Sequence, residues 1–196
     1  MAPLRVETRE RMQSRRLALV EATLSAPDGP CARASGLFLA APDAAQTGLA
    51  LAGPEGLAEE PLWPARPSEV PASGFARDVR VRWTRGLTRG HALWIQCRRP
   101  LFTGRAASPL QRAAAAADFT TAVAVLVAVR EGRPPAALIN ADTSLYLARA
   151  PVGGWLGFEL EACDDAGARG LCAARIFDRQ GALGRSLQAS VAARRA

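Results

Sequence analysis

The segment LINADTSLYLAR, residues 138–149, places Asn140, Asp142 and Ser144 at every second position. If the segment is a strand, these polar side chains share one face, and residues such as Leu145 form a mostly apolar opposite face. Asp and Asn are poor strand formers. Two interpretations are open: the solvated face of an ordinary half-buried strand, or the wall of a wet cleft in which a carboxylate acts as a general base for water.

A second alternating segment supplies an amide. In GRSLQASVAA, residues 184–193, Gln188 lies on the polar face between Ser186 and Ser190. A primary amide can hold a water molecule because it offers both a donor and an acceptor. Asp142 and Gln188 therefore supply the residue types that a water-activating base and a water-orienting amide require. Periodicity alone does not show that the two side chains meet.

Three further polar residues are candidates for binding substrate. Asn140 and Ser144 flank Asp142 on the predicted polar face, and Asp118 interrupts the Ala-rich stretch AAADF. For Asp118, a hydrogen bond within the core or to a turn and a place on the wall of the site are equally open. If the site exists, we expect all three residues to line it.

Other catalytic machinery is excluded by what the sequence lacks. The single histidine, His91, stands at the start of a predicted strand, where a turn or surface residue is the simpler interpretation. Nucleophile-elbow, zinc-protease and phosphate-loop motifs do not occur. The four cysteines, Cys31, Cys97, Cys163 and Cys172, lack the paired spacing of metal ligands. We predict reduced, mostly buried thiols and neither a metal nor a cofactor.

Composition bounds the class of protein. The chain of 196 residues is 49% hydrophobic, which suffices for a substantial core. All 25 basic residues are Arg, and the net charge is +7, but the Arg pairs are dispersed and no aromatic platform for bases accompanies them. We predict no nucleic-acid partner. Because no apolar run of about 18 residues and no signal-like N-terminus occurs, we expect a cytoplasmic protein without a membrane span.

The first part of the chain changes character near residue 41. Residues 5–40 predict β structure, with a two-stranded hairpin around the turn SAPDG. Residues 41–76 are rich in Pro, Gly, Ala and Glu, which indicates a linker or crossing loop. Strands resume in DVRVRW and HALWIQCRRP.

One long helix is predicted over residues 108–132, because Ser108 can cap it, Pro109 suits its first position and Gly132 can end it. Its apolar, nearly uncharged middle indicates a helix that is buried on most sides. Four strands are predicted to follow as an antiparallel meander, in ALINADTSLYLAR, WLGFELEAC, GLCAARIFD and GRSLQASVAA.

This order predicts an α+β hot-dog fold in residues 77–196: an antiparallel sheet wrapped around one long central helix. A faint repeat, VEATLSAPDGPCARASGLF against LEACDDAGARGLCAARIF, suggests that residues 1–40 are a partial second hot-dog. Because a leading strand and helix are missing before them, either Met1 is not the natural start or another chain covers the sheet. The apolar face around Val20 and Leu24 therefore predicts a homo-oligomer.

The motifs SPLQRAAAAADF, INADTSLYLARAPVGGWLGFELEA and FDRQGALGRSLQ together resemble the C-terminal hot-dog of the acyl-CoA thioesterase II type. The resemblance covers about residues 75–192, and residues 5–40 resemble the closing strands of that family's N-terminal hot-dog. It implies hydrolysis of acyl-CoA thioesters without a covalent intermediate, by an Asp, a Thr or Ser, and a Gln that hold and activate water. By position, the Asp falls on Asp142 and the Gln on Gln188.

The hydroxyl residue departs from that pattern. Its expected position holds Ala162, with Cys163 beside it, and Ala cannot hold water. The family's N-terminal helix, which helps to present backbone N–H groups to the thioester carbonyl, is also missing. Losing one such donor costs about 100- to 1000-fold in kcat. Two functions are therefore open: an acyl-CoA thioesterase, or a catalytically weak hot-dog module that binds acyl-CoA or a partner protein.

Overall fold

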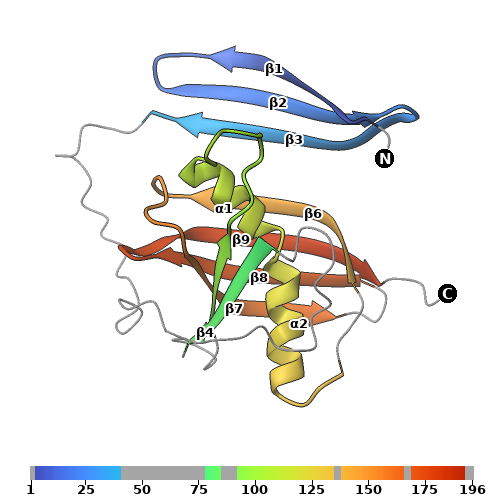
Figure 1. The fold of residues 1–196 in the computed structure, drawn as a ribbon, viewed down its shortest axis with the longest axis vertical. Coiled ribbons are helices and arrows are strands. Elements are labelled where there is room, and N and C mark those ends of the chain that lie inside the picture. Colours follow the sequence, from blue (N-terminus) through green and yellow to red (C-terminus); the bar gives the residue numbers. More distant parts are fainter. Residues whose placement is uncertain (1–2, 41–77, 85–91, 135–137, 166–168, 193–196) are drawn as a thin grey trace. The chain divides into compact units, whose positions relative to one another are not determined.

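A computed structural model of the protein divides the chain into two units, which are described separately below (Figure 1). The first comprises residues 1–50 and the second residues 51–196. The predicted linker, residues 41–76, and His91 lie outside the described residues. The structure describes residues 3–40, 78–84, 92–134, 138–165 and 169–192.

The first unit is a three-stranded antiparallel sheet in the order β1-β2-β3. Its strands are β1 (Arg5–Gln13), β2 (Leu17–Ala26) and β3 (Gly29–Leu39). Gly29 follows the β2–β3 turn with φ +127°, a backbone conformation that favours glycine. The predicted hairpin is confirmed, and the residues before it add a third strand.

The second unit contains a six-stranded antiparallel sheet in the order β4-β5-β7-β8-β9-β6. The three consecutive strands β7, β8 and β9 form the predicted meander. The strand that precedes them in sequence, β6, pairs with β9 and not with β7, so the prediction that all four follow one another across the sheet is wrong. The strands are β4 (Val79–Thr84), β5 (Ala92–Cys97), β6 (Leu138–Leu147), β7 (Leu156–Asp165), β8 (Arg169–Asp178) and β9 (Gly181–Ala192).

The predicted long central helix is two helices, α1 (Pro109–Ala117) and α2 (Thr120–Arg130), bent by 54° at their junction. The predicted start is confirmed: Ser108 accepts a hydrogen bond from the Gln111 backbone N–H, and the Gln111 side chain accepts from the Ser108 N–H. After α2, Gly132 adopts φ +75°, as a helix-ending glycine does.

The core of the second unit lies between the two helices and the sheet, as the arrangement in Figure 1 shows. Val123 of α2 packs in one cluster with Phe158 of β7 and Ile176 of β8, and each of these side chains is at most 1% exposed. Burying a side chain of this kind contributes about 1.5–3 kcal/mol. The unit is therefore an α+β domain in which a bent helix pair covers one face of an antiparallel sheet.

Among the described residues, no single helix is long and apolar enough to cross a bilayer. The helices α1 and α2 have the necessary length and apolar composition only when the bent pair is taken together.

Candidate active site

The junction between α1 and α2 is held by a side chain from the sheet. In a continuous helix the N–H of Thr121 would donate to the carbonyl of Ala117. Here it donates to Gln188 Oε1 of β9, at 2.7 Å. The Ala117 carbonyl instead accepts from the hydroxyl of Thr120, also at 2.7 Å. The helix break is thus satisfied by hydrogen bonds that a continuous helix would not need.

The carbonyl of Asp118, inside the break, accepts two further hydrogen bonds from strand amides. Asn140 Nδ2 of β6 donates to it at 2.8 Å, and Gln188 Nε2 donates at 3.3 Å. A backbone carbonyl that loses its helical donor needs another partner, and these amides supply it. Asp118 is therefore fixed in place by two neighbouring strands.

The Gln188 side chain is fully buried, and both its oxygen and its nitrogen form hydrogen bonds. Besides its bonds to Thr121 and Asp118, its Nε2 donates to Thr143 Oγ1 of β6 at 2.6 Å. A second link lies beside it, where the buried hydroxyls of Thr120 and Ser186 are 2.7 Å apart. These contacts attach the first turn of α2 to β9. Gln188 therefore acts as a positioning residue at the helix break.

The Asp118 carboxylate points to the exposed side of this junction. Asn140 Nδ2 donates to Asp118 Oδ1 at 3.0 Å, which fixes the plane of the carboxylate. Among the described residues no hydrogen bond to Asp118 Oδ2 is formed, so that oxygen can accept from a water molecule. Burial, and after it the negative charge of Asp118, raises the pKa of the Cys97 thiol to about 11. The negative charge of Asp118 therefore also affects the thiol of Cys97 on β5.

A β-bulge in β6 changes which residues share a face. Asn140 is opposite Ser190, but the next residue paired with β9 is Asp142, opposite Ala189, so Ala141 is an extra residue. Such a bulge reverses the alternation of side chains beyond it. The prediction that Asn140, Asp142 and Ser144 share one face is therefore wrong.

Beyond the bulge, Thr143 is opposite Gln188 and Ser144 is opposite Leu187. The structure brings together Asp118, Asn140, Thr143 and Gln188. It does not bring Asp142 to Gln188, because neighbouring positions of β9 point to opposite faces.

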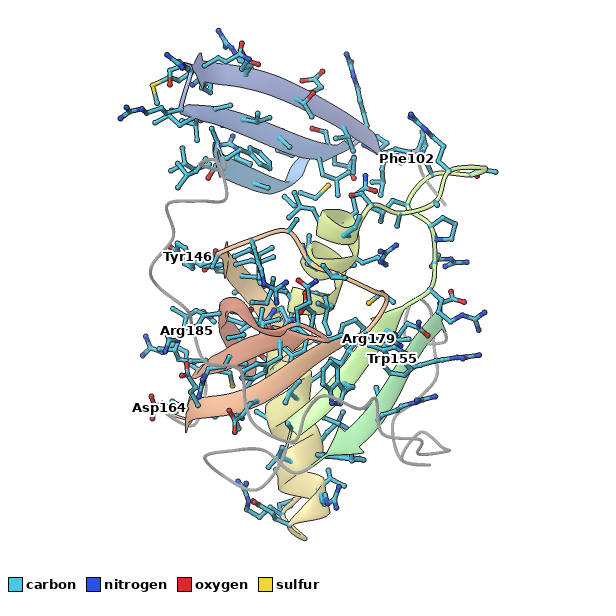
Figure 2. The ribbon with its side chains drawn as sticks, turned by 90° about the vertical axis from the view of Figure 1, so that its left-hand side faces the viewer. Phe102, Tyr146, Trp155, Asp164, Arg179 and Arg185 are labelled. Atoms are coloured by element: carbon cyan, nitrogen blue, oxygen red, sulfur yellow. The ribbon has the colours of Figure 1, made fainter. Side chains whose placement is uncertain are left out.

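Asp142 lies on the outer face of the sheet, away from the helix junction. Its cross-strand row contains Ala189, Leu171 and Asp164, from β9, β8 and β7. Figure 2 shows Asp164 along the outer margin of the sheet, together with Tyr146 and Arg185. Tyr146 is 72% exposed. Asp142 and Ser144 therefore stand on the face that carries these exposed side chains.

Ala162, the expected position of a hydroxyl residue, also lies away from the junction. It pairs with Ala173 of β8, which pairs with Leu187 of β9, so this row belongs to the outer face. The hydroxyl that contacts Gln188 is that of Thr143. An alanine at position 162 therefore leaves the junction unaffected.

One sequence signal marked the junction. Asp118 is the only charged residue between Arg112 and Arg130, inside a stretch otherwise made of Ala, Val, Leu, Phe and Thr. Two β-branched threonines follow it within three positions, and both residue types are poor in a helix interior. A helix break at Asp118 fits this pattern better than a continuous buried helix does.

Comparison with known protein families gives one match that spans residues 54–192, well over half of the chain. The matching family is the acyl-CoA thioesterase C-terminal domain. The chain belongs to this family. Membership supports thioester hydrolysis in general as its chemistry. No curated protein sequence matches the chain significantly.

Solved structures show the fold of this thioesterase-family chain. The TesB protein of Mycobacterium avium subspecies paratuberculosis is 17% identical over 98% of this chain and 72% of its own, with a TM-score of 0.60. A Thermobifida fusca protein named as a thioesterase II is 18% identical over 97% and 73%, with a TM-score of 0.67. An Alicyclobacillus acidocaldarius hot-dog protein is 16% identical over 97% and 73%, with a TM-score of 0.65. The predicted hot-dog class is confirmed, although two helices that meet at a bend replace the one long helix.

Proposed function

We propose that this chain hydrolyses acyl-CoA thioesters with a water molecule that the Asp118 carboxylate activates. The observation that carries the proposal is the carboxylate at the helix break, exposed to solvent and fixed through Oδ1 by Asn140 at 3.0 Å. A positioned general base typically contributes about 100- to 10,000-fold in rate. Family membership supplies the substrate class, and the contacts of Asp118 support its role.

In the proposed reaction, Asp118 Oδ2 accepts a proton from water as the water oxygen attacks the thioester carbonyl carbon. Negative charge develops on the carbonyl oxygen. The N-terminus of α2 begins directly beside Asp118, and its N-cap residue Phe119 provides no side-chain cap. The positive end of a helix stabilises such a charge. The C–S bond then breaks, and coenzyme A leaves as the thiol after taking the proton from Asp118.

Asn140 and Gln188 are proposed as positioning residues in this scheme. Asn140 donates to both the carbonyl and the carboxylate of Asp118, while Gln188 is buried and joins Asp118, Thr121 and Thr143. Gln188 therefore orients the break and not the water. This differs from the roles expected from the sequence, in which Asp142 was the base and Gln188 held the water.

Thiol release from a panel of acyl-CoA thioesters tests the function itself. Turnover that depends on the enzyme, and that varies with the acyl group, supports the proposal. Acyl-CoA binding measured by calorimetry with no release of coenzyme A would instead support a binding module.

Single-turnover hydrolysis in 18O-labelled water tests whether Asp118 acts as base or nucleophile. With enzyme in excess, direct attack by water places 18O in the released acid. Attack by Asp118 would form an anhydride, and attack of water on the Asp118 carbonyl carbon of that anhydride would leave the label in the Asp118 carboxylate. Label found in the tryptic peptide that contains Asp118 would therefore overturn the role of this residue as a base.

The proposed partner is the acyl-CoA substrate. The cytoplasmic location and the self-association expected from the sequence stay predictions.

A further inference from the structure

Two thiols lie opposite each other on neighbouring strands, outside the proposed catalytic residues. Cys163 of β7 pairs in register with Cys172 of β8. Directly opposed residues in an antiparallel sheet have Cα atoms about 4.5–5.5 Å apart. A disulfide spans Cα separations of about 4.4–6.8 Å. Neither cysteine is in a disulfide, so both side chains are thiols. The backbone therefore already has the spacing that a disulfide needs.

The two thiols differ in access to solvent. Cys163 is exposed, whereas Cys172 is 0% exposed. The hydrogen bond with the Cys163 thiol, followed by burial, raises the pKa of the Cys172 thiol. A small oxidant from solvent therefore meets Cys163 first, and Cys172 is placed to react with the product.

We propose that Cys163 and Cys172 form a reversible disulfide when the protein meets hydrogen peroxide. The Cys163 thiolate attacks one peroxide oxygen, the O–O bond breaks, hydroxide leaves, and a sulfenic acid forms. The Cys172 sulfur then attacks the Cys163 sulfur and the S–O bond breaks. The proton of Cys172 leaves with that oxygen as water. The leaving hydroxide takes up the proton that the Cys163 thiol released on forming its thiolate. Two electrons thus pass from the two thiols to peroxide, which ends as two molecules of water.

The disulfide would form next to the helix junction. Cys172 is paired in register with Gln188 on its other side. Thr121 belongs to the same group of residues, because its backbone N–H donates to Gln188. Its buried hydroxyl lies beside the Cys172 thiol. Among the described residues, that hydroxyl has no hydrogen-bond partner of good geometry. A bond from the Cys172 sulfur to Cys163 would change the contact of that sulfur with the Thr121 hydroxyl. Oxidation therefore acts on the residues that hold Asp118.

Peptide mapping after peroxide treatment tests the disulfide directly. Arg169 stands between the two cysteines, so trypsin places Cys163 in residues 150–169 and Cys172 in residues 170–175. The expected result is a linked pair of these peptides, a loss of about 2 Da from the intact chain, and recovery of the free thiols with dithiothreitol. Added oxygen on Cys163 without linkage, or no reaction at either cysteine, would overturn the proposal.

Variants make the assignment specific. Cys163→Ser is expected to abolish the linked pair, because the exposed thiol is the one that reacts with peroxide. Cys31→Ser removes an exposed thiol of the first unit and is expected to leave the linkage unchanged. Linkage that persists in Cys163→Ser, or that is lost in Cys31→Ser, would contradict the pairing. The wild-type map does not depend on the folding of either variant.

The effect on activity rests on the proposed function. Small displacements of positioned groups can cost about 100-fold in rate, so we expect oxidation to lower wild-type thiol release at least tenfold and dithiothreitol to restore it. Cys163→Ser is expected to keep its activity through the same treatment. If the linked peptides form and activity is unchanged, the disulfide stands but its effect on the active site is overturned. If the protein shows no turnover at all, peptide mapping still tests whether the disulfide forms.

Discussion

At the scale of single residues, Asp118 and Asp142 show why residue type alone does not identify a base. Both carboxylates are exposed. Only Asp118 has its carboxylate bonded by a strand amide and its backbone carbonyl held by two amides. Asp142 lies opposite Ala189 on the outer face. A base needs a fixed direction as well as a charge, and the hydrogen bonds of Asp118 supply that direction.

Gln188→Leu is expected to destabilise the second unit by about 1–3 kcal/mol. The variant leaves the Thr121 N–H without its acceptor and removes one of the two donors to the Asp118 carbonyl. Urea denaturation followed by circular dichroism measures the loss. Leu187→Ala, at the adjacent and 42% exposed position on the other face, is the matched control. We expect it to cost less, and equal losses would contradict the role of Gln188.

Part of the site was visible in the sequence at this scale. Asn140, Gln188 and Asp118 were all identified as candidates from their residue types. Their contacts with one another were not predicted, because Gln188 contacts Asp118 across 70 residues of sequence, and no local pattern encodes that contact. The pairing of Asp142 with Gln188 failed because one extra residue, Ala141, reverses the faces of β6.

At the scale of elements, the helix break and the bulge belong to the same piece of structure. The break exposes backbone groups that need partners, and the bulge lets Asn140 contact Asp118 and Thr143 contact Gln188 on the same side of the sheet. Strand boundaries were predictable because alternation and turn residues are local signals. The break was not predicted, because its stabilising partners come from β6 and β9, which lie later in the chain.

Gly184→Ala is expected to disrupt the pairing of β6 with β9. A Cβ at Gly184 would clash with the backbone carbonyl oxygen of Tyr146, which cannot move without breaking the ladder. We expect a loss of stability well above the ordinary range of about 0.5–3 kcal/mol, measured by thermal unfolding.

Gly36→Ala in β3 provides a control for that substitution. Its added Cβ would meet only the ring of Phe38, at 2.9 Å, and that exposed side chain can rotate away. We expect a small effect. A mild phenotype for Gly184→Ala would show that β6 can shift relative to β9.

The connection between β6 and β7 is anchored by an ion pair whose strength depends on pH. Burial alone would raise the pKa of the Asp178 carboxyl, but hydrogen bonds from Arg149 and from the N–H groups of Val152 and Gln180 lower it below its usual value. A lowered folded-state pKa stabilises the fold above the unfolded-state pKa, which is about 3.9. That stabilisation is lost as the pH falls through the folded-state pKa.

Asp178→Asn is therefore expected to lower stability at neutral pH and to flatten its dependence on pH below about 4. Denaturant midpoints between pH 7 and pH 3 measure both effects. Asp28→Asn, at an exposed position in the β2–β3 turn, serves as a control and is expected to follow the wild-type curve. Parallel curves for wild type and Asp178→Asn would contradict the anchoring role of the ion pair.

At the scale of the whole molecule, the family and the fold class followed from the order of elements and from motifs spread along the chain. The strand order did not follow, because β6 pairs with β9, the last strand, and local pattern does not specify that long-range choice. The first unit remains a sheet of three strands whose larger apolar side chains include Val6, 64% exposed, and Phe38, 48% exposed.

We expect the protein to self-associate through this first unit. Exposed apolar side chains and strand edges favour pairing with a second chain. Sedimentation over a range of concentrations is expected to show a dimer that dissociates on dilution. Val6→Glu, which places a charge on edge strand β1, is expected to shift the equilibrium towards monomer, and Glu7→Gln on the same strand is the control. A monomer at every concentration would contradict this expectation.

The most direct test of the catalytic assignment compares kcat for thiol release between Asp118→Asn and Asp142→Asn. Both changes replace an exposed carboxylate by an amide of the same shape. A difference in kcat between the two variants is therefore not explained by unfolding of one of them. We predict that Asp118→Asn loses about 100-fold or more, whereas Asp142→Asn stays within about twofold of the wild type. Wild-type activity in Asp118→Asn, or a greater loss in Asp142→Asn, would contradict the assignment of Asp118 as the base.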